Sequence, residues 1–425
     1  MSNPRTPPRS RGRDVSLSHL RAVPPPESLD DWLHTLSSSS RELAPLLERP
    51  EADQRRLGYY HTLREIAQQP LTWPATARLM TDRRDPIASV FGGRSSVLLT
   101  GSGSSYYAAE CLALALQASL GVPTQAIPAG LLLTHAATLL AKGRPSVLVS
   151  FARSGDSPES AAALDTLLDA GFDCRHLIIT CNREGRLATG YTERGNVLPI
   201  VLDDRTNDRS LVMTSSFTNM VLAGRALGFL ASGLLYEEIT ARLAALARDV
   251  LRRHLDPVAR AARSEFRSAL FLGTGSRFGA AREAALKMLE MSAGRVTCTS
   301  SSYLELRHGP MSAVHDDTLV VAFLASDPRT RAYEVDLLEE LDRKRLGARK
   351  VIVGGNIPAT LLSSDDVAVD CAAATSVGDD DLPIVDVLVG QLLACFRCLH
   401  LGLRPDAPSP GGIINRVVES FTIHR

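Results

Sequence analysis

The sequence lacks a net charge, a long apolar run and an apolar segment near Met1. Its 47 basic and 47 acidic residues balance, so no global charge attracts nucleic acid or an acidic membrane surface. No uninterrupted run of about 18 apolar residues is present, which predicts that no helix spans a bilayer. The arginines after Met1 have no apolar stretch behind them, unlike a secretory signal. We therefore expect a cytoplasmic protein that binds neither nucleic acid nor membranes.

The common signatures of nucleotide and metal sites are also absent. No G-x-x-x-x-G-K-[S/T] occurs, and Tyr106 takes the last position of what would be G-x-G-x-x-G in the first Gly-rich turn. The seven cysteines are scattered and odd in number, which favours free thiols over disulfides. Cys395 and Cys398 form a C-x-x-C, but they lie in an apolar run where helical spacing makes them core residues. Neither a metal nor an organic cofactor is predicted.

The chain is too long for one ordinary hydrophobic core, and its 425 residues predict two domains with additional segments. Residues 1–40 are rich in Pro, Ser and Arg and are expected to form a disordered tail. Residues 41–92 show helical spacing of apolar side chains, punctuated by Pro70 and Pro74. The predicted units that follow are a first domain over 93–250, a second over 251–403 and a C-terminal segment over 404–425.

A pattern of three short apolar strands occurs twice. The strands are expected to start at 97, 147 and 177 in the first half, and at 269, 319 and 351 in the second. A Gly-x-Gly-Ser turn follows the first strand each time, at 101–104 and 273–276. Short apolar strands separated by helix-length segments indicate a parallel sheet covered on both faces. The predicted fold class is α/β, with two homologous doubly wound sheets, each in a three-layer α/β/α sandwich and joined by a helix over 236–255.

Three hydroxyl-rich turns in the first domain predict a binding site. Glycines let the backbone approach a ligand, and helix-start amides and hydroxyls suit an anion such as phosphate. Each turn alone could be an ordinary capped helix start, but the ends of neighbouring parallel strands meet in one crevice. As a set they indicate a small phosphorylated ligand with several hydroxyls. The candidate binding residues are Ser104, Ser105, Arg153, Ser154, Ser157, Thr214, Ser215 and Arg416, the two arginines being equally compatible with structural ion pairs.

The second domain supplies candidates for acid–base chemistry. Lys287 and Glu290 are three residues apart and share a helix face, which by itself favours a surface ion pair. His308 is followed by Gly309 and Pro310, so a turn holds it rather than a core. A carboxylate and an imidazole are the groups that proton transfers on a sugar require, one to move a carbon-bound proton and one to open the ring.

Together these motifs resemble the sugar isomerase (SIS) domains. The chain is most similar to the two-domain galactosamine-6-phosphate deaminase/isomerase family of the AgaS type, formerly described as tagatose-6-phosphate ketose/aldose isomerases. The resemblance extends from about residue 60 to the C-terminus. The segments that carry it are 64–70, 150–160, 180–182, 213–216, 279–283, 285–290, 307–310 and 415–418.

The resemblance implies a role for each candidate. Ser105, Ser154 and Ser157 match the hydroxyls that hold the sugar phosphate, and Thr214 and Ser215 are expected to line the same pocket. The remaining contacts to the substrate are assigned to Ser104, Arg153, Arg307 and Arg416.

The implied catalytic residues are Glu290, Lys287 and His308. Glu290 matches the base that moves a proton between C1 and C2, and His308 matches the ring-opening histidine. In this superfamily that histidine can reach the site from a neighbouring domain or subunit, so a homo-oligomer is expected. The implied reaction converts a 2-amino-2-deoxy-hexose 6-phosphate, with galactosamine 6-phosphate favoured, into a ketose 6-phosphate and ammonia.

Some positions depart from the family pattern. Met311 stands where a lysine is usual after His-Gly-Pro, and Glu305-Leu306 stands where Gly-Phe is usual. The absence of a cysteine near Met1 and of a lysine in 415–419 argues against the related amidotransferases. Two alternatives remain at this stage, an aldose–ketose isomerase acting on another sugar phosphate and a non-catalytic sugar-phosphate sensor. The sensor is disfavoured because no basic recognition helix precedes residue 75 and the Glu–His pair is retained.

Overall fold

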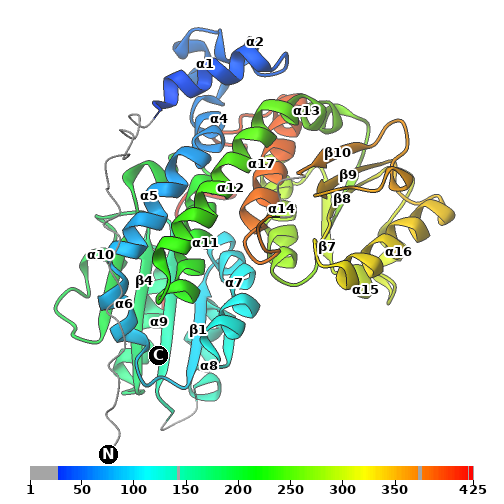
Figure 1. Ribbon diagram of the computed structural model, residues 1–425. Coiled ribbons are helices and arrows are strands. Elements are labelled where there is room, and N and C mark those ends of the chain that lie inside the picture. Colours follow the sequence, from blue (N-terminus) through cyan, green and yellow to red (C-terminus); the bar gives the residue numbers. More distant parts are fainter. Residues whose placement is uncertain (1–26, 141–143, 372–375, 420, 425) are drawn as a thin grey trace, which may run out of the picture.

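Two five-stranded parallel sheets form the body of the protein, with helices around and between them (Figure 1). The computed structural model describes residues 27–140, 144–371, 376–419 and 421–424. The first sheet has the order β2-β1-β3-β4-β5 and consists of β1 (Ser96–Gly101), β2 (Thr124–Pro128), β3 (Ser146–Ala152), β4 (Cys174–Thr180) and β5 (Val197–Val201). The second has the order β10-β9-β8-β6-β7 and consists of β6 (Ser268–Leu272), β7 (Thr297–Ser301), β8 (Thr318–Phe323), β9 (Arg349–Gly354) and β10 (Val367–Asp370).

The two sheets have the same topology. Read from its other edge, the second sheet runs β7-β6-β8-β9-β10, which matches β2-β1-β3-β4-β5 strand for strand. Every strand pair in both sheets is parallel. The predicted α/β class is therefore confirmed, and the two sheets share one strand order.

Helices follow the strands in both units. The first sheet is accompanied by α7 (Ser104–Leu120), α8 (Ala129–Leu139), α9 (Pro158–Asp169), α10 (Arg186–Thr189) and α11 (Ser215–Ala226). The second is accompanied by α13 (Leu255–Arg263), α14 (Ser276–Met291), α15 (Tyr303–Leu306), α16 (Pro328–Lys344) and α17 (Pro383–His400). The N-terminal helices are α1 (Leu29–Ser39), α2 (Ala44–Leu47), α3 (Glu51–Leu57), α4 (Tyr60–Ala67), α5 (Gln69–Asp82) and α6 (Arg84–Phe91), and α12 (Gly233–Arg253) connects the two units.

In the first sheet, side chains that alternate between the two faces of a strand contact helices on both sides. In β3, Val147 and Val149 pack into a large core cluster with Phe217 of α11. Leu148, on the opposite face, packs into a separate cluster with Leu164 of α9. Because successive side chains point to opposite faces, an all-apolar strand buries both of its faces. The three-layer arrangement expected from the sequence is confirmed here.

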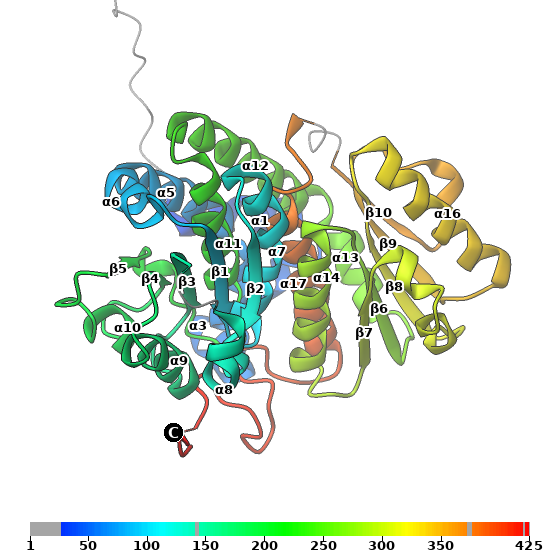
Figure 2. The ribbon, with the colours of Figure 1, turned by 90° about the horizontal axis from the view of Figure 1, so that it is seen from below.

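Three helices, α7, α14 and α17, lie between the two sheets (Figure 2). A Cβ at Gly279 of α14 would lie 2.6 Å from the Cys111 backbone nitrogen of α7, so a side chain would separate these helices. A Cβ at Gly390 of α17 would lie 2.5 Å from the Ala284 Cβ. These glycines allow backbone-to-backbone packing, and the large core cluster continues from one sheet to the other.

Helix α17 is the described helix that is long and apolar enough to compare with a membrane span, although polar residues such as Asp386 and Arg397 interrupt its sequence. The 18 residues of this helix have a mean hydropathy of 1.4, enough by length and composition to cross a bilayer, although 89% of that window is buried inside the fold. Cys395 and Cys398 are both buried on this helix, as predicted. The helix is apolar around its circumference because it packs against helices from both units.

Two expectations about the N-terminal region were wrong. Residues 29–39, assigned to a disordered tail, form α1, in which Trp32 and Leu36 are buried and the Trp32 Nε1 donates to the Ala67 carbonyl at 2.9 Å. Residues 1–26 of that predicted tail lie outside the described residues. Pro74 does not interrupt the helical segment but lies inside α5, which packs against α11 and α12. Tertiary packing compensates there for the missing backbone donor.

Candidate active site

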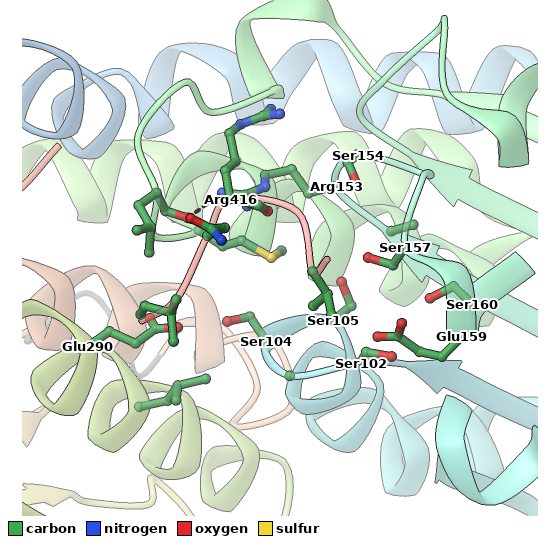
Figure 3. A pocket seen from close by; sticks show the side chains of 18 of the residues that line it. Ser102, Ser104, Ser105, Arg153, Ser154, Ser157, Glu159, Ser160, Glu290 and Arg416 are labelled. Atoms are coloured by element: carbon green, nitrogen blue, oxygen red, sulfur yellow. Dashed lines mark hydrogen bonds between the residues drawn. The ribbon is translucent and has the colours of Figure 1, made fainter. Parts of the chain in front are cut away.

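A cavity of about 680 Å³ lies at the carboxyl ends of β1 and β3, where the β1–α7 and β3–α9 turns meet (Figure 3). Part of its wall is α14 of the second domain, and the C-terminal segment forms another part. Its polar lining consists of Ser102, Ser104, Ser105, Arg153, Ser154, Ser157, Glu159, Ser160, Glu290, Asn415, Arg416 and Glu419. The convergence of hydroxyls predicted from the sequence is therefore observed for the first two turns.

The β1–α7 turn brings three serines to the cavity. Gly103 has φ +55°, a left-handed conformation that an L side chain rarely adopts. A Cβ at Gly101 would lie 2.5 Å from the Ser105 carbonyl carbon, so the helix starts directly against the strand end. No side chain caps α7, and within the described residues the Ser105 hydroxyl has no protein partner. The turn therefore presents an unoccupied hydroxyl at a helix N-terminus, which suits an anion.

The β3–α9 turn has the same character. Ser157 is the N-cap residue of α9 and Pro158 its first residue, yet the Ser157 side chain makes no capping hydrogen bond. The turn is held from outside, because the Asn182 side-chain amide donates to the Ser154 carbonyl at 2.8 Å. Across the described chain no other group occupies the Ser157 hydroxyl. A second free hydroxyl thus stands at a second helix start beside the first.

The catalytic candidates Lys287 and Glu290 meet the first-domain turn in this cavity. The Lys287 ammonium is fully buried, donates to the Ser104 hydroxyl at 3.1 Å and forms an ion pair with Glu290. The Glu290 side chain is 21% exposed and lines the cavity. A carboxylate and an ammonium group of the second domain therefore lie beside the hydroxyl-rich turn of the first.

A third charged residue, Glu283, lies beneath this pair. One of its carboxylate oxygens is 3.4 Å from the Lys287 Nζ, and the residue is fully buried. Burial raises the pKa of Glu283 to about 8, although the Lys287 charge acts in the opposite direction. Burial also acts to lower the pKa of Lys287, but the two glutamates outweigh it and the net direction is upward. The Lys287 ammonium therefore lies between two carboxyl groups, one buried beneath it and one at the cavity wall.

Comparison with known proteins gives a consistent result, although no family model matches the chain. A proposed D-galactosamine-6-phosphate deaminase AgaS of Streptomyces coelicolor is 36% identical over 372 residues, covering 86% of this chain and 95% of that protein. The D-galactosamine-6-phosphate deaminase AgaS of Shewanella sp. ANA-3 is 33% identical, covering 86% of this chain and 92% of that protein. The chain belongs to the AgaS family.

The structural comparison agrees with this assignment. A solved Clostridium novyi structure, described as a proposed tagatose-6-phosphate ketose/aldose isomerase, superposes with a TM-score of 0.83. It is 30% identical and covers 89% of this chain and 99% of that one. The resemblance to AgaS-type proteins drawn from the sequence motifs is therefore confirmed along both units.

The two arginines assigned to the ligand are held by backbone carbonyls in this AgaS-family chain. Arg153 donates to the Leu211 carbonyl at 2.8 Å and also to the Arg416 carbonyl. Arg416 donates to the Asp208 carbonyl at 2.8 Å and to the Asn207 side chain. Both line the cavity, but their guanidinium groups anchor the C-terminal segment to the loop before α11.

Two predicted cavity residues lie elsewhere, and that expectation needs correction. Thr214 and Ser215 are fully buried at the start of α11 and are not part of the cavity wall. The Asp208 carboxylate accepts from the backbone amides of Thr214 at 2.7 Å and of Ser216 at 2.9 Å, and from the Ser215 hydroxyl. The hydroxyl-rich sequence here serves a helix start capped by a carboxylate within the fold.

The His308 turn of the AgaS-family chain also lies away from its own cavity. His308 is exposed after α15, beside the second sheet, and neither it nor Arg307 is among the lining residues. Arg307 instead pairs with Glu340 of α16 at 2.7 Å. Lys344, which also binds Glu340, has its Nζ 3.3 Å from the Met311 Sδ. A lysine from α16 therefore stands next to the position where Met311 replaces the usual lysine.

Sequence reasoning did not assign several residues that the AgaS-family site contains. Ser102, Glu159 and Ser160 line the cavity, and Glu283 lies beneath it. Glu283 could have been found, because it precedes Lys287 by four residues and shares the helix face with Glu290. In the part of the chain that the structure describes, no group of three His, Cys, Asp or Glu residues is arranged to hold a metal ion.

Proposed function

We propose that this cavity converts galactosamine 6-phosphate into a ketose 6-phosphate and ammonia. The observation that carries the proposal is the contact of the Lys287–Glu290 pair with the Ser104 hydroxyl, which joins a base to a hydroxyl cradle in one cavity. Relatives named D-galactosamine-6-phosphate deaminase support the choice of substrate.

The hydroxyls of Ser105, Ser154 and Ser157 hold the phosphate in this proposal. They lie at the starts of α7 and α9, where helix dipoles and backbone amides favour negative charge. The phosphate then fixes the sugar with its C1–C2 end toward α14. Arg153 and Arg416 act by holding the C-terminal segment over the cavity.

Glu290 is the proposed base. In the open-chain aldehyde it takes the proton from C2, the C1 oxygen gains a proton, and an enolamine forms. Returning the proton to C1 leaves a C2 imine, and water adds to this carbon and releases ammonia, so C2 becomes the ketone carbon. Lys287 positions the Glu290 carboxylate and balances its charge.

Ring opening is assigned to His308 of a second copy of the chain. The support is that His308 is exposed and lies outside the cavity of its own chain. We therefore propose a homo-oligomer in which each site receives this imidazole from a neighbouring subunit. Such a site would be incomplete in a monomer.

The experiment that tests the function is a parallel assay of ammonia and ketose. The purified protein is offered galactosamine 6-phosphate and glucosamine 6-phosphate separately. Equal amounts of ammonia and ketose from galactosamine 6-phosphate are expected, with slower release from the other epimer. In a third assay the protein is offered an aldose 6-phosphate without an amino group. Ketose formation from that sugar, with no ammonia from either amino sugar, would instead identify an aldose–ketose isomerase.

A further inference from the structure

A second cavity, of about 520 Å³, lies at the second sheet in the place that the first cavity has at the first sheet. It is formed where the β6–α14 turn meets the start of α16, and α15 packs beside α16 (Figure 1). Its walls include Thr274, Tyr303, Leu304, Asp327, Tyr333 and Glu334. Both sheets therefore have an open crevice at the carboxyl ends of equivalent strands, where α/β sheets bind ligands.

The anion-binding features of the first cavity are occupied in the second by the protein's own carboxylates. Asp327 is the N-cap residue before Pro328, as Ser157 is before Pro158, and it accepts from the Thr330 amide at 2.8 Å. The Asp379 carboxylate accepts from the Ser326 amide at 2.7 Å. These negative charges fill the donors that a phosphate would need. The exposed Arg329 is the one cation among the lining residues.

Glu334 faces this cavity with unused hydrogen-bonding capacity. The residue is 1% exposed, and its Oε2 accepts from the Ala325 amide at 2.7 Å. Among the described residues its Oε1 has no hydrogen-bond partner. A buried carboxyl oxygen without a partner is costly, and a ligand that donates a hydrogen bond to it would remove that cost.

The other walls are apolar. The Tyr303 ring is buried, and its hydroxyl donates to the Phe323 carbonyl at 3.0 Å. Tyr333 and Leu304 are 47% and 50% exposed. An aromatic face beside carboxylates attracts a cation that carries apolar carbon surface. The lining combines a ring-binding wall with an acidic end.

We propose that this second cavity binds a small hydroxylated amine without phosphate, of the amino-sugar class. Its ammonium group contacts the Glu334 and Asp327 carboxylates, and its ring packs against Tyr333. The Thr274 side chain lies at the same end of the cavity, beside the Glu334 carboxyl group. This assignment does not depend on the reaction proposed for the first cavity.

The test measures the affinity of the full-length protein for D-galactosamine by titration calorimetry. Saturable binding is expected. D-galactose, which lacks the ammonium group, is expected to bind with an affinity at least about tenfold lower. Glu334→Gln keeps an acceptor for the Ala325 amide and is expected to weaken D-galactosamine binding about tenfold. Tyr333→Ala, at an exposed position that folding tolerates, is expected to weaken it as well.

Glu290→Gln in the first cavity is the matched control, because Glu290 faces the C1–C2 end of the sugar there, and it is expected to leave D-galactosamine affinity unchanged. Glu334→Gln and Tyr333→Ala are expected to leave ammonia release from galactosamine 6-phosphate unchanged, which separates this proposal from the proposed function. Loss of D-galactosamine binding in Glu290→Gln would place the probe in the first cavity and overturn the proposal. Equal affinity in wild type and Tyr333→Ala, or no saturable binding to wild type, would overturn it too.

Discussion

The Lys287 ammonium and the Ser104 hydroxyl lie 3.1 Å apart, although 183 residues separate them in the chain. Ser104 is the first residue of α7, and Lys287 lies in the middle of α14. The close contact of these helices at Gly279 brings the two residues together. The site is therefore assembled by the packing of the two domains, and its geometry depends on that interface.

Glu290→Gln tests the assigned base. We expect kcat for ammonia release to fall by about 10²–10⁴-fold, because an amide cannot accept the C2 proton. The folded state should persist, since the amide oxygen can still accept from Lys287. The measurement is steady-state kinetics together with a thermal melt. Glu238→Gln, at an exposed position on α12, is the control, and an undiminished rate in Glu290→Gln would exclude the assignment.

Ser157→Ala and Ser215→Ala separate the ligand site from the helix cap. Ser157 lines the cavity, so its loss is expected to raise KM for the sugar phosphate about 10- to 100-fold, the value of a hydrogen bond to a charged group. Ser215 binds Asp208 away from the cavity, so its loss is expected to lower stability by about 1 kcal/mol and leave KM unchanged. The measurements are KM and urea unfolding of both variants. A raised KM in Ser215→Ala, with an unchanged KM in Ser157→Ala, would show that Ser215 and not Ser157 contacts the ligand.

Asp386→Asn tests the buried ion pair of the second domain. Arg277 lies in the first turn of α14, directly after the second Gly-rich turn. It donates to the Asp386 carboxylate at 2.7 and 2.6 Å, and both residues are almost fully buried. Removing the Asp386 charge leaves Asp379, 3.6 Å from Arg277 and partly exposed, as the nearest carboxylate to the buried guanidinium, and we expect about 3 kcal/mol of lost stability in urea unfolding.

The control for this pair is Asp204→Asn, which breaks the exposed pair with Arg183. The Arg183 Nε and the Asp204 Oδ1 are 2.8 Å apart and both side chains are well exposed. We therefore expect Asp204→Asn to lower the free energy of unfolding by at most about 1 kcal/mol. Arg277→Met combined with Asp386→Leu is expected to recover most of the loss, because it removes both buried charges. Equal effects of Asp386→Asn and Asp204→Asn would contradict the assigned role.

His176 is expected to make stability depend on pH. It is buried on β4, and burial lowers its pKa to about 4, below the ordinary value of about 6.5. Between these values the unfolded chain binds more protons than the folded chain, so stability falls as pH falls from about 6.5 to 4. From pH 7 to pH 5 this group alone should remove about 2 kcal/mol.

The measurement is urea unfolding of wild type and His176→Leu at pH 7 and pH 5. The stability difference between the two pH values should be smaller in the variant by about 2 kcal/mol. His34→Gln, at an exposed position on α1, should behave as wild type. A pH dependence unchanged by His176→Leu would show that the imidazole is not desolvated.

Local patterns predicted some elements and misjudged others for identifiable reasons. The strand beginning at 147 was recognised because both of its faces are apolar, and β3 is buried throughout. The Pro- and Ser-rich composition around α1 predicts disorder, but Trp32 and Leu36 are buried and hold that helix against the fold. The hydroxyls of Thr214 and Ser215 resemble those of the binding turns in sequence. In the structure Asp208, six residues before Thr214, instead accepts from the Thr214 backbone amide and from the Ser215 hydroxyl.

The sequence by itself determined the duplicated α/β topology, the two hydroxyl turns and the AgaS resemblance, because apolar periodicity and turn residues act over a few positions. Only the tertiary structure decided that Glu283 lies beneath Lys287, that Arg153 and Arg416 hold the C-terminal segment, and that His308 lies outside its own cavity. It also decided that the second crevice is acidic, because Asp379 reaches the Ser326 amide across 53 residues. Such contacts depend on how distant segments pack, and no local pattern encodes that packing.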